Sequence, residues 1–434
     1  MRPVADRLAD LLGQFLDGPL PLRLRAWDGS EVGPADVPVV ALRGPAALRR
    51  LLWQRNELGL AEAYVAGDID VHGDLAQALG RAGRSVRDRE VRRPGAAALA
   101  AAAVLAAGLG VAGPPPRRPE GRARLVGRPH SAARDRAAIG HHYDLSNEFY
   151  ALLLDPATMA YSCAYWSRPA DPSYGLAEAQ TDKLELICDK LGLGRGDRLL
   201  DVGCGWGSLA VHAARERGAR VTAVTLSAEQ RDFVVLRAAR EGVADLVDVQ
   251  LRHWRDIDGG EYDAAATVEM GEHVGDREYA RFAGLLRAVL RPEGRLLVQQ
   301  MSRGATAPGG GRFIETYIAP DMHMRPLGRT ADLLESAGLE VRSVESLREH
   351  YTRTIDAWRA NLEDRWVEVE GLVGETTGRV WRLYLAGASL AFAEGRMGVD
   401  QFLAVNPTRE GASGMHAAAS PCIPSTRSAR GARP

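Results

Sequence analysis

The chain has 434 residues, which is too long for one compact core, so we expect two domains joined by a linker. Its hydrophobic share of 46% and charged share of 26% are typical of a folded globular protein, and its net charge of −1 gives no overall basic surface for binding nucleic acid. Four cysteines without CxxC spacing, and no signal peptide ahead of them, predict a cytoplasmic protein without a disulfide framework or a zinc ribbon.

Residues 1–90 are expected to form a small amino-terminal α+β domain. The segments LPLRLRAWDG and VPVVALRG predict two or three short strands around an Asp-Gly turn. The stretch GPAALRRLLWQRNELGLAEAYVAGDIDV then predicts helices that end at a Gly-Asp turn.

Residues 91–137 are rich in Ala, Pro and Arg and predict a linker. Within it, GAAALAAAAVLAAGLGVAG (95–113) is wholly apolar and nearly long enough to cross a bilayer, but Ala and Gly drive insertion far less than Leu or Phe. Arginines outnumber acids by six to two in 81–93 and by seven to two in 117–136. Basic clusters beside an apolar helix suit the surface of an anionic membrane. Three interpretations stay open: a loose helical linker, peripheral membrane contact and a true span.

Strands and helices alternate from about residue 138 to residue 410. The predicted strands are RLLDVG (198–203), RVTAVTL (220–226), VDVQL (247–251), YDAAATVEM (262–270) and GRLLVQQM (294–301). Helical stretches follow the first two, and another lies around 276–290. This spacing predicts an α/β fold with a doubly wound, mostly parallel sheet, whose ligand binds outside the carboxyl ends of the strands. From about 411 the sequence is small, polar and broken by proline, which predicts a disordered tail.

A glycine loop, DVGCGWGSL (201–209), joins the first of these strands to its helix. Gly203, Gly205 and Gly207 allow a tight turn and a close approach of the backbone to a ligand, beside a helix N-terminus. The spacing is GxGxG, not GxGxxG, and the second strand ends in VTLSAEQ without the acid that suits the ribose of NAD. Asp201, just before the first glycine, therefore favours S-adenosylmethionine (SAM).

Five ordered motifs carry a family resemblance. They are HHYDLSNEFY (141–150), YSCAYW (161–166), LLDVGCGWGSLA, VTLSAEQ and EMGEHVG (269–275). In this order and at these distances they resemble the cyclopropane-fatty-acyl-phospholipid synthase family, which includes the mycolic acid cyclopropane synthases. The resemblance covers about residues 140–405, and the first domain also resembles the small amino-terminal domain of the bacterial phospholipid enzymes. It implies a Rossmann-like class I SAM methyltransferase fold.

The resemblance also implies which residues bind SAM. They would be Tyr161, Ser162, Asp201, the loop Gly203–Gly207, Thr225, Gln230 and Trp254. Trp254 would lie against the adenine, although a core tryptophan fits that residue equally well when it is taken alone.

The chemistry implied by the resemblance is methyl transfer to a cis double bond in an unsaturated phospholipid acyl chain. The carbocation formed would then lose a proton and close a cyclopropane ring. Because an alkene is a weak nucleophile, its positioning against SAM would lower much of the barrier. The rings of Tyr161, Tyr165 and Trp166, with Tyr317 as a further ring, would line a water-free pocket and stabilise the cation.

The resemblance implies bicarbonate as the base, held by Cys163, Glu272 and Tyr351. Taken alone, Cys163 fits a small buried hydrophobe. The chain departs from the family's LLHTI at LLVQQMS, where Gln299 stands at the histidine and cannot titrate near neutral pH. The QQMS and IAPDMHMRP segments resemble a sister branch that makes methylene- or methyl-branched chains, for which Glu148 is an alternative base. Bicarbonate, and the choice between a cyclopropane and a branched product, therefore stay open.

Three other functional classes fit less well. A small-molecule SAM methyltransferase needs a polar acceptor pocket, whereas the segments here are apolar and aromatic. A nucleic-acid methyltransferase would show a [DNS]PPY motif, and the Arg clusters lack interleaved aromatic residues. A non-catalytic lipid-binding module would not need Glu272 and Tyr351. The expected partner is phospholipid at the inner face of a membrane, contacted peripherally, while the sequence leaves open a homo-oligomer and a partner reductase that finishes the product.

The basic residues are strongly biased toward arginine. Lys183 and Lys190 are the only lysines among the 55 Lys and Arg residues. A GC-rich genome accounts for this bias, so the composition by itself predicts nothing about function.

Overall fold

The computed structural model describes residues 2–13, 20–88, 96–123, 125, 127–143, 145–304 and 309–415. These divide into two compact units. The first comprises Met1–Pro156, Thr306–His323 and Arg348–Gly398, and the second Ala157–Ala305, Met324–Leu347 and Val399–Pro434. The division does not follow the chain order expected from the sequence, because two later segments group with the amino-terminal part.

The first unit contains a four-stranded sheet. Its strands, in the order β2-β1-β3-β4, are β2 (Glu31–Val32), β1 (Arg23–Arg25), β3 (Val39–Leu42) and β4 (Ile69–His72). Only β1 and β3 pair in parallel. Helices α1 (Val4–Gly13), α2 (Pro45–Trp53), α3 (Glu57–Val65) and α4 (Leu75–Asp88) belong to the same part of the chain. The sequence predicted a Gly-Asp turn after α3 but not the strand β4 that follows it directly.

The apolar stretch expected as a linker forms helix α5 (Ala96–Gly108). Leu105 and the following Leu109 pack into the same apolar cluster as α1. Arg49 of α2 donates a hydrogen bond to the carbonyl of Val111 (2.9 Å). The stretch is therefore a packed helix and not a loose segment. Within the described part of the chain, no helix combines the length and the apolarity needed to cross a membrane.

Further helices complete the first unit. They are α6 (Ala132–Tyr143), α7 (Asn147–Leu153), α12 (Arg312–Tyr317), α14 (Arg348–Asp364) and α15 (Trp366–Ala393). Arg379 of α15 donates hydrogen bonds to the carbonyls of Tyr64 (2.8 Å) and Ile69 (2.9 Å). These bonds tie α15 to α3 and to the start of β4.

The second unit is built on a seven-stranded sheet in the order β10-β11-β9-β8-β5-β6-β7. Its strands are β5 (Arg198–Val202), β6 (Arg220–Thr225), β7 (Val247–Leu251), β8 (Tyr262–Val268), β9 (Leu290–Ser302), β10 (Glu340–Ser346) and β11 (Gly398–Val405). Strands β5 to β9 pair in parallel, and β10 pairs antiparallel with β11. The doubly wound α/β sheet predicted from the sequence is confirmed.

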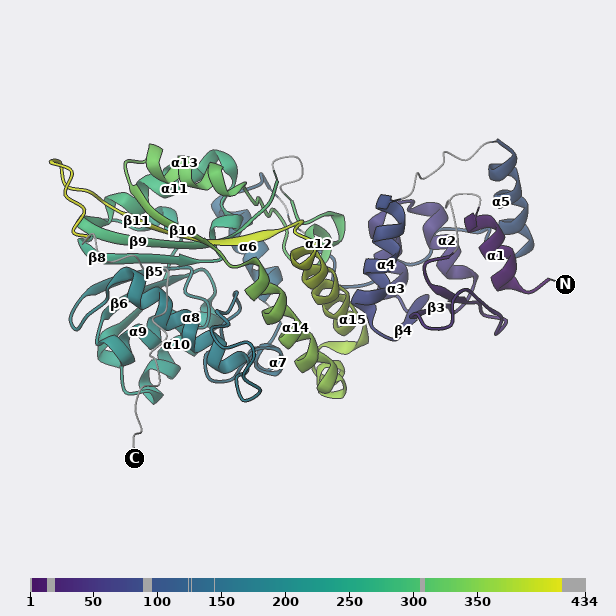
Figure 1. Ribbon diagram of the computed structural model, residues 1–434, viewed down its shortest axis with the longest axis horizontal. Coiled ribbons are helices and arrows are strands. Elements are labelled where there is room, and N and C mark those ends of the chain that lie inside the picture. Colours follow the sequence, from purple (N-terminus) through teal and green to yellow (C-terminus); the bar gives the residue numbers. More distant parts are fainter. Residues whose placement is uncertain are drawn as a thin grey trace, which may run out of the picture. The chain divides into compact units, whose positions relative to one another are not determined.

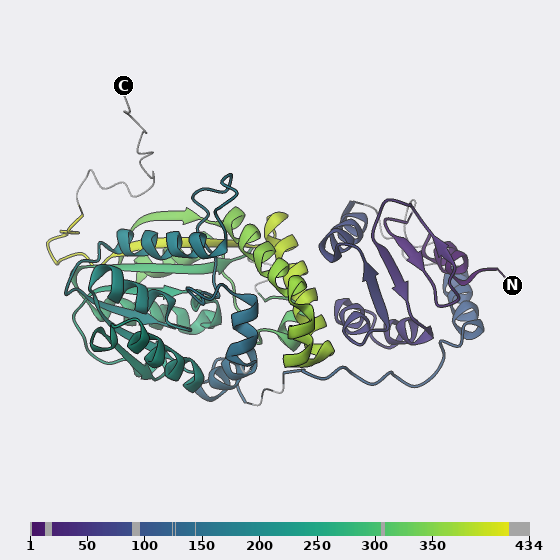
Figure 2. The same ribbon diagram turned by 90° about the horizontal axis from the view of Figure 1, so that it is seen from below.

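Helices cover both faces of this sheet (Figures 1 and 2). Helices α8 (Leu176–Leu191), α9 (Ser208–Arg217) and α10 (Ala228–Arg240) lie on one face, and α11 (Asp276–Ala288) and α13 (Leu327–Ser336) lie on the other. Consecutive residues of β5, Leu199 and Leu200, are both fully buried and belong to the cores on opposite faces. This two-sided burial explains the continuous apolar run in the sequence. Because the strand order reverses at β5, its carboxyl end is the expected place for a ligand.

Candidate active site

The glycine loop after β5 has left-handed φ values of +85° at Gly203, +53° at Gly205 and +76° at Gly207. A Cβ atom at the first would lie 2.9 Å from Met270, and one at the third would lie 2.7 Å from Val234. These two glycines are therefore required by packing as well as by φ. A Cβ at Gly205 would meet nothing within 4 Å, so the loop is open to a ligand at this residue.

Asp201 lies on β5 just before the loop and is 2% exposed. Its Oδ2 atom has no hydrogen-bond partner among the described residues. Burial raises the pKa of Asp201 to about 7, while the positive charge of Lys183 acts in the opposite direction. Since a buried carboxylate oxygen needs a donor, this atom is suited to accept one from a ligand.

The second strand contributes Thr225, whose hydroxyl donates to Oε1 of Gln230 (2.8 Å). Gln230 is 4% exposed, and its Nε2 atom has no partner within the described chain. Trp254 is buried, packs edge-to-face on Phe282 (5.2 Å) and lies under the guanidinium of Arg255 (4.5 Å). The site thus offers one unpaired acceptor at Asp201 and one unpaired donor at Gln230, which fits a polar ligand such as SAM.

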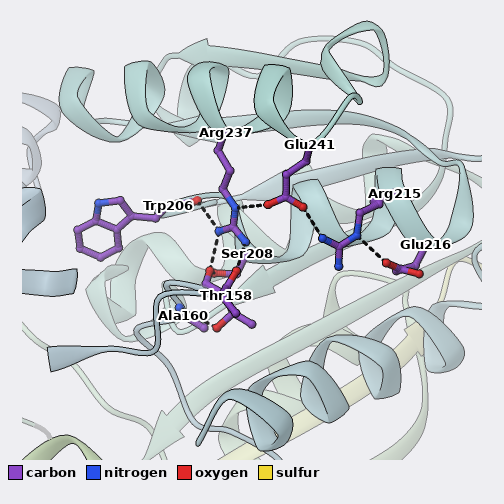
Figure 3. A network of polar contacts seen from close by, with 9 residues as sticks. Thr158, Ala160, Trp206, Ser208, Arg215, Glu216, Arg237 and Glu241 are labelled. Atoms are coloured by element: carbon purple, nitrogen blue, oxygen red, sulfur yellow. Dashed lines mark hydrogen bonds and ion pairs between the residues drawn. The ribbon is translucent and has the colours of Figure 1, made fainter. Parts of the chain in front are cut away.

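Arg237 of α10 holds the segment before YSCAYW against the glycine loop (Figure 3). Its guanidinium donates to the carbonyls of Ala157 and Thr158, each at 2.6 Å, and of Trp206 at 3.3 Å. The hydroxyl of Ser208 also donates to the Thr158 carbonyl (2.8 Å). Arg237 therefore connects three parts of the cofactor site, and no motif in the sequence pointed to it.

The first residues of YSCAYW are fixed by helix α8. The hydroxyl of Ser162 accepts from Nζ of Lys183 (2.9 Å), and its carbonyl accepts from Nε2 of Gln180 (2.9 Å). Tyr161 is half-buried beside it. The charge of Lys183 also acts against the burial that raises the pKa of Asp201, so the same ammonium group lies near two predicted cofactor residues, Ser162 and Asp201.

The remaining rings of the motif have packing roles. Trp166 packs edge-to-face on Tyr174 (6.0 Å), in a small cluster with residues of α8. The backbone N–H of Tyr165 donates to the carbonyl of Ala179 on that helix (3.0 Å). Tyr317 belongs to the first unit, where its hydroxyl donates to the buried Glu62 (3.0 Å).

A carboxylate that the sequence analysis did not single out, Glu269, lies next to the predicted catalytic residues. It follows β8 with a φ of +53°, which is uncommon for a residue other than glycine and marks local strain. Its Oε1 atom accepts from the backbone N–H of Cys163 (2.7 Å) and from Nε2 of Gln299 (2.9 Å). The one sequence signal was its position as the first charged residue after an apolar strand, at the ligand-binding edge.

Glu272 lies in the 3-10 turn Gly271–His273 and is 1% exposed. Burial, and then the negative charge of Glu269, raise the pKa of Glu272 well above its ordinary value. The amides of Glu272 and Met301 act in the opposite direction, but neither carboxyl oxygen has a hydrogen-bond partner among the described residues. Burial and the nearby Glu269 thus favour the protonated form of Glu272, whereas the two N–H donors to Glu269 favour a carboxylate there.

Arg325 holds the turn that carries Glu272. It is 1% exposed and donates to the carbonyl of Gly271 (3.2 Å) and to Asp276 at the start of α11 (3.0 Å). Its guanidinium also lies 4.1 Å from the ring centroid of Tyr279. These contacts fix the turn relative to α11, so Glu272 has a defined position beside Glu269.

Bicarbonate, which the resemblance implied, does not fit this arrangement. The backbone N–H of Cys163 and the side chain of Gln299 both donate to Glu269 already. A second anion at these donors would face the charge of Glu269. The third expected holder, Tyr351, lies on α14 in the first unit, where its ring packs on Phe392 (4.5 Å) and Trp358 (6.0 Å).

Two further predicted residues have distinct surroundings. Cys163 is fully buried, and its thiol points at the carbonyls of Ala164 (3.3 Å) and Leu347 (3.7 Å), which suits a structural or binding group. Glu148 is exposed in the first turn of α7, where its own amide and the side chain of Ser146 lower its pKa. An exposed carboxylate is poorly suited to a reaction that must exclude water, so Glu269 is the better candidate for the base.

Comparison with known proteins gives consistent relatives. A family model described as mycolic acid cyclopropane synthetase matches residues 130–402. A probable fatty acid methyltransferase of Pseudomonas putida is 38% identical over 410 residues, covering 90% of this chain and 93% of that protein. The tuberculostearic acid methyltransferase UfaA1 of Mycobacterium tuberculosis is 35% identical over 292 residues, covering 65% of this chain and 67% of that protein.

A solved structure is similar to this chain as well. The mycolic acid cyclopropane synthase CmaA1, in complex with SAH and CTAB, matches with a TM-score of 0.58 at 31% identity and covers 62% of this chain and 97% of its own. All the candidate residues described above, from Glu148 to Tyr351, lie within the range that the family model matches.

Proposed function

The chain belongs to the mycolic acid cyclopropane synthetase family of SAM-dependent methyltransferases, and we propose that it transfers a methyl group from SAM to a cis double bond of an unsaturated phospholipid acyl chain. One observation carries the proposal: the carboxyl group of Glu269 accepts hydrogen bonds from two donors beside the buried Glu272, whose pKa is raised, at the ligand edge of the sheet. A carboxylate at Glu269 can stabilise a nearby carbocation by its negative charge and can then accept the proton that the cation must lose.

The residues around the glycine loop would hold SAM, which supplies an electrophilic methyl group. Oδ2 of Asp201 is available to accept a hydrogen bond and Nε2 of Gln230 to donate one. The open backbone at Gly205 allows close approach. Arg237 and Lys183 fix the segment 157–162 against this loop, so the cofactor would meet a preformed wall.

The proposed role of Glu269 is to accept the proton that the carbocation must lose. The new carbon–carbon bond forms as the bond from sulfur to the methyl carbon breaks, and the charge passes to the neighbouring acyl carbon. Glu269 then takes a proton from the added methyl carbon. The raised pKa of Glu272 favours its protonated form, so the pair carries a single negative charge opposite the cation until Glu269 accepts the proton.

For the product, we propose a methylene-branched acyl chain. Gln299 cannot relay a proton as a histidine would, so the methyl proton should leave more slowly than in family members that carry the histidine. Before the methyl proton leaves, a hydride shifts from the methylated carbon to its cationic neighbour. The positive charge then lies on the methylated carbon, which is the more substituted of the two. Proton loss from the methyl group then leaves an exocyclic methylene.

The cyclopropane expected from the resemblance is the second candidate product. It arises from the same first cation when the methyl proton leaves before the hydride shift, and the added carbon then closes the ring. The description of the matching family favours this outcome.

The test uses purified protein, vesicles of an unsaturated phospholipid and SAM carrying a ¹³C-labelled methyl group. Carbon NMR of the extracted lipid distinguishes an olefinic methylene carbon from a cyclopropyl carbon. Label in an olefinic carbon supports the methylene-branched product. Label in a cyclopropyl carbon contradicts that product and supports the cyclopropane. An active preparation that leaves the acyl chains unlabelled contradicts the proposed function.

Access to the lipid is part of the proposal, and we propose that the surface around α5 contacts the membrane. Val104 of α5 is 75% exposed, and Trp53 of α2 is 60% exposed. The indole N–H of Trp53 donates to the carbonyl of Gly113, five residues after the end of α5, so Trp53 lies against the segment that follows this helix. An exposed tryptophan beside an apolar helix suits the interface of a bilayer.

Sedimentation with vesicles that contain anionic phospholipid tests this surface. The double variant Trp53→Asp and Val104→Asp should reduce the bound fraction severalfold. Leu236→Asp is the matched control, because Leu236 is 66% exposed on α10 in the other unit. Equal losses in the two proteins, or no loss in either, would contradict a role for the α5 surface.

A further inference from the structure

We propose that Lys190 is a positioning residue, which fixes the side-chain amide of Gln299 with its N–H toward Glu269 through a second buried glutamine, Gln401. The inference rests on the proposed function, because it concerns the orientation of the proton acceptor. It assigns a role to a residue of α8 that is connected to Glu269 through the two glutamines.

The chain of hydrogen bonds runs across α8, β11 and β9. Nζ of Lys190 donates to Oε1 of Gln401 (2.6 Å), and Nε2 of Gln401 donates to Oε1 of Gln299 (2.8 Å). Nε2 of Gln299 then donates to Oε1 of Glu269 (2.9 Å). The first three side chains are at most 2% exposed, so water does not compete for these bonds.

The direction of the chain follows from its ends. A glutamine amide has nearly the same shape in its two flipped orientations, so its neighbours decide which end donates. An ammonium group can only donate, which forces the oxygen of Gln401 toward Lys190 and its N–H toward Gln299. At the other end, the carbonyl of Cys163 can only accept, and it lies 3.4 Å from Nε2 of Gln299. Both ends require the same orientation.

The choice of lysine supports a specific role. The chain has 55 Lys and Arg residues, and its only two lysines are both buried in α8, at Lys183 (1% exposed) and Lys190 (2% exposed). Their spacing of seven residues places them on one face of the helix. Arginine stands at all the other basic positions, so lysine occurs only where a compact, rotatable ammonium is enclosed. Lys190 uses this geometry to donate to Glu345 (2.5 Å) as well as to Gln401.

The orientation matters because of the charge on Glu269. With Nε2 toward it, Gln299 stabilises the carboxylate. A flipped amide would present an oxygen to that carboxylate and disfavour the charged form that accepts a proton. The titratable groups near this carboxylate include Glu272, whose pKa is raised by burial and by this carboxylate, and Arg325, whose charge acts on the pKa of Glu272 in the opposite direction.

Gln401→Glu is the sharpest variant, because it keeps the size of the side chain and the bond from Lys190 but removes the donor to Gln299. Lys190→Met removes the other end of the chain. For both variants, kcat for acyl methylation should fall about tenfold or more, and the acid limb of its pH profile should move up by about one unit, as expected when a carboxylate loses a charge-assisted hydrogen bond. The Kd for SAM should stay within about twofold, because the chain does not touch the cofactor loop.

Lys183→Met is the matched control on the same helix. It removes an equally buried ammonium that donates to Ser162, so it should raise the Kd for SAM and leave the acid limb in place. Melting temperatures, measured alongside, show that each variant is folded. If Lys190→Met lowers kcat without moving the acid limb, or if Gln401→Glu leaves both unchanged, Lys190 does not orient the acceptor. If the wild-type protein methylates no acyl chain, the proposed function fails and not this inference alone.

Discussion

The variant Glu269→Gln tests the proposed proton acceptor directly. It replaces one carboxylate oxygen with an NH₂ group and keeps the length of the side chain. The remaining oxygen can still accept from the N–H of Cys163 (2.7 Å) and from Gln299 (2.9 Å), so the free energy of unfolding should change by no more than about 1–2 kcal/mol. An amide cannot take up a proton at neutral pH, so kcat should fall by about 10²–10⁴. That loss corresponds to about 3–5 kcal/mol of barrier.

The assay measures transfer of labelled methyl from SAM to vesicle lipid, with SAM affinity determined by calorimetry on the same preparation. Glu272→Gln is the comparison, because the raised pKa of Glu272 favours a neutral side chain there. An isosteric amide there should lower kcat less than tenfold, since no charge is removed. The assignment of Glu269 as the base is refuted if Glu269→Gln keeps kcat within about threefold of the wild type, or if the two variants lose equal activity.

Three further predictions concern the cofactor site. Because the pKa of Asp201 is raised from 3.8 to about 7, the folded apoprotein holds a proton that the unfolded chain releases between these pH values. The free energy of unfolding should therefore fall by about 4 kcal/mol as the pH rises from about 4 to about 7. Asp201→Asn should remove this pH dependence in melts of the apoprotein and should weaken SAM binding. Gly207→Ala places a methyl group 2.7 Å from Val234 and should destabilise the fold by about 2 kcal/mol or more in denaturant titrations. Gly205→Ala has open space but a left-handed φ, so it should destabilise the fold less than Gly207→Ala and should raise the Kd for SAM. Arg237→Met breaks three hydrogen bonds to carbonyls and should lower stability by about 3 kcal/mol and raise the KM for SAM more than it lowers kcat; an unchanged KM would show that the segment before YSCAYW does not shape the cofactor site.

The EMGEHVG motif shows how far the sequence could predict the site. The motif directed attention to Glu272, and the structure places that residue in a buried turn after β8, as expected for the ligand edge of the sheet. Which of the two glutamates carries the charge could not be read from the motif. That depends on burial and on the N–H of Cys163, which is 106 residues away in the chain and donates to Glu269.

The arginine bias gives a second example. From composition alone, the scarcity of lysine had no functional meaning. The role of the two lysines depends on where they lie. Both are buried on α8, where Lys183 donates to Ser162 and Lys190 donates to Gln401. Similarly, the sequence of the apolar stretch 95–113 allowed a linker, a membrane span or a surface helix. In the structure, Leu105 and Leu109 pack in the same apolar cluster as α1.

The sequence by itself determined the doubly wound sheet, the glycine loop and the cofactor class, because these follow from apolar periodicity and from glycine positions within short segments of chain. Only the tertiary structure decided which groups are paired, since the contacts of Glu269, Gln299, Gln401 and Lys190 join segments separated by up to 211 residues. Hydrogen-bond direction and charge at a buried site are set by whichever donors and acceptors the fold brings together, and local sequence does not specify those partners.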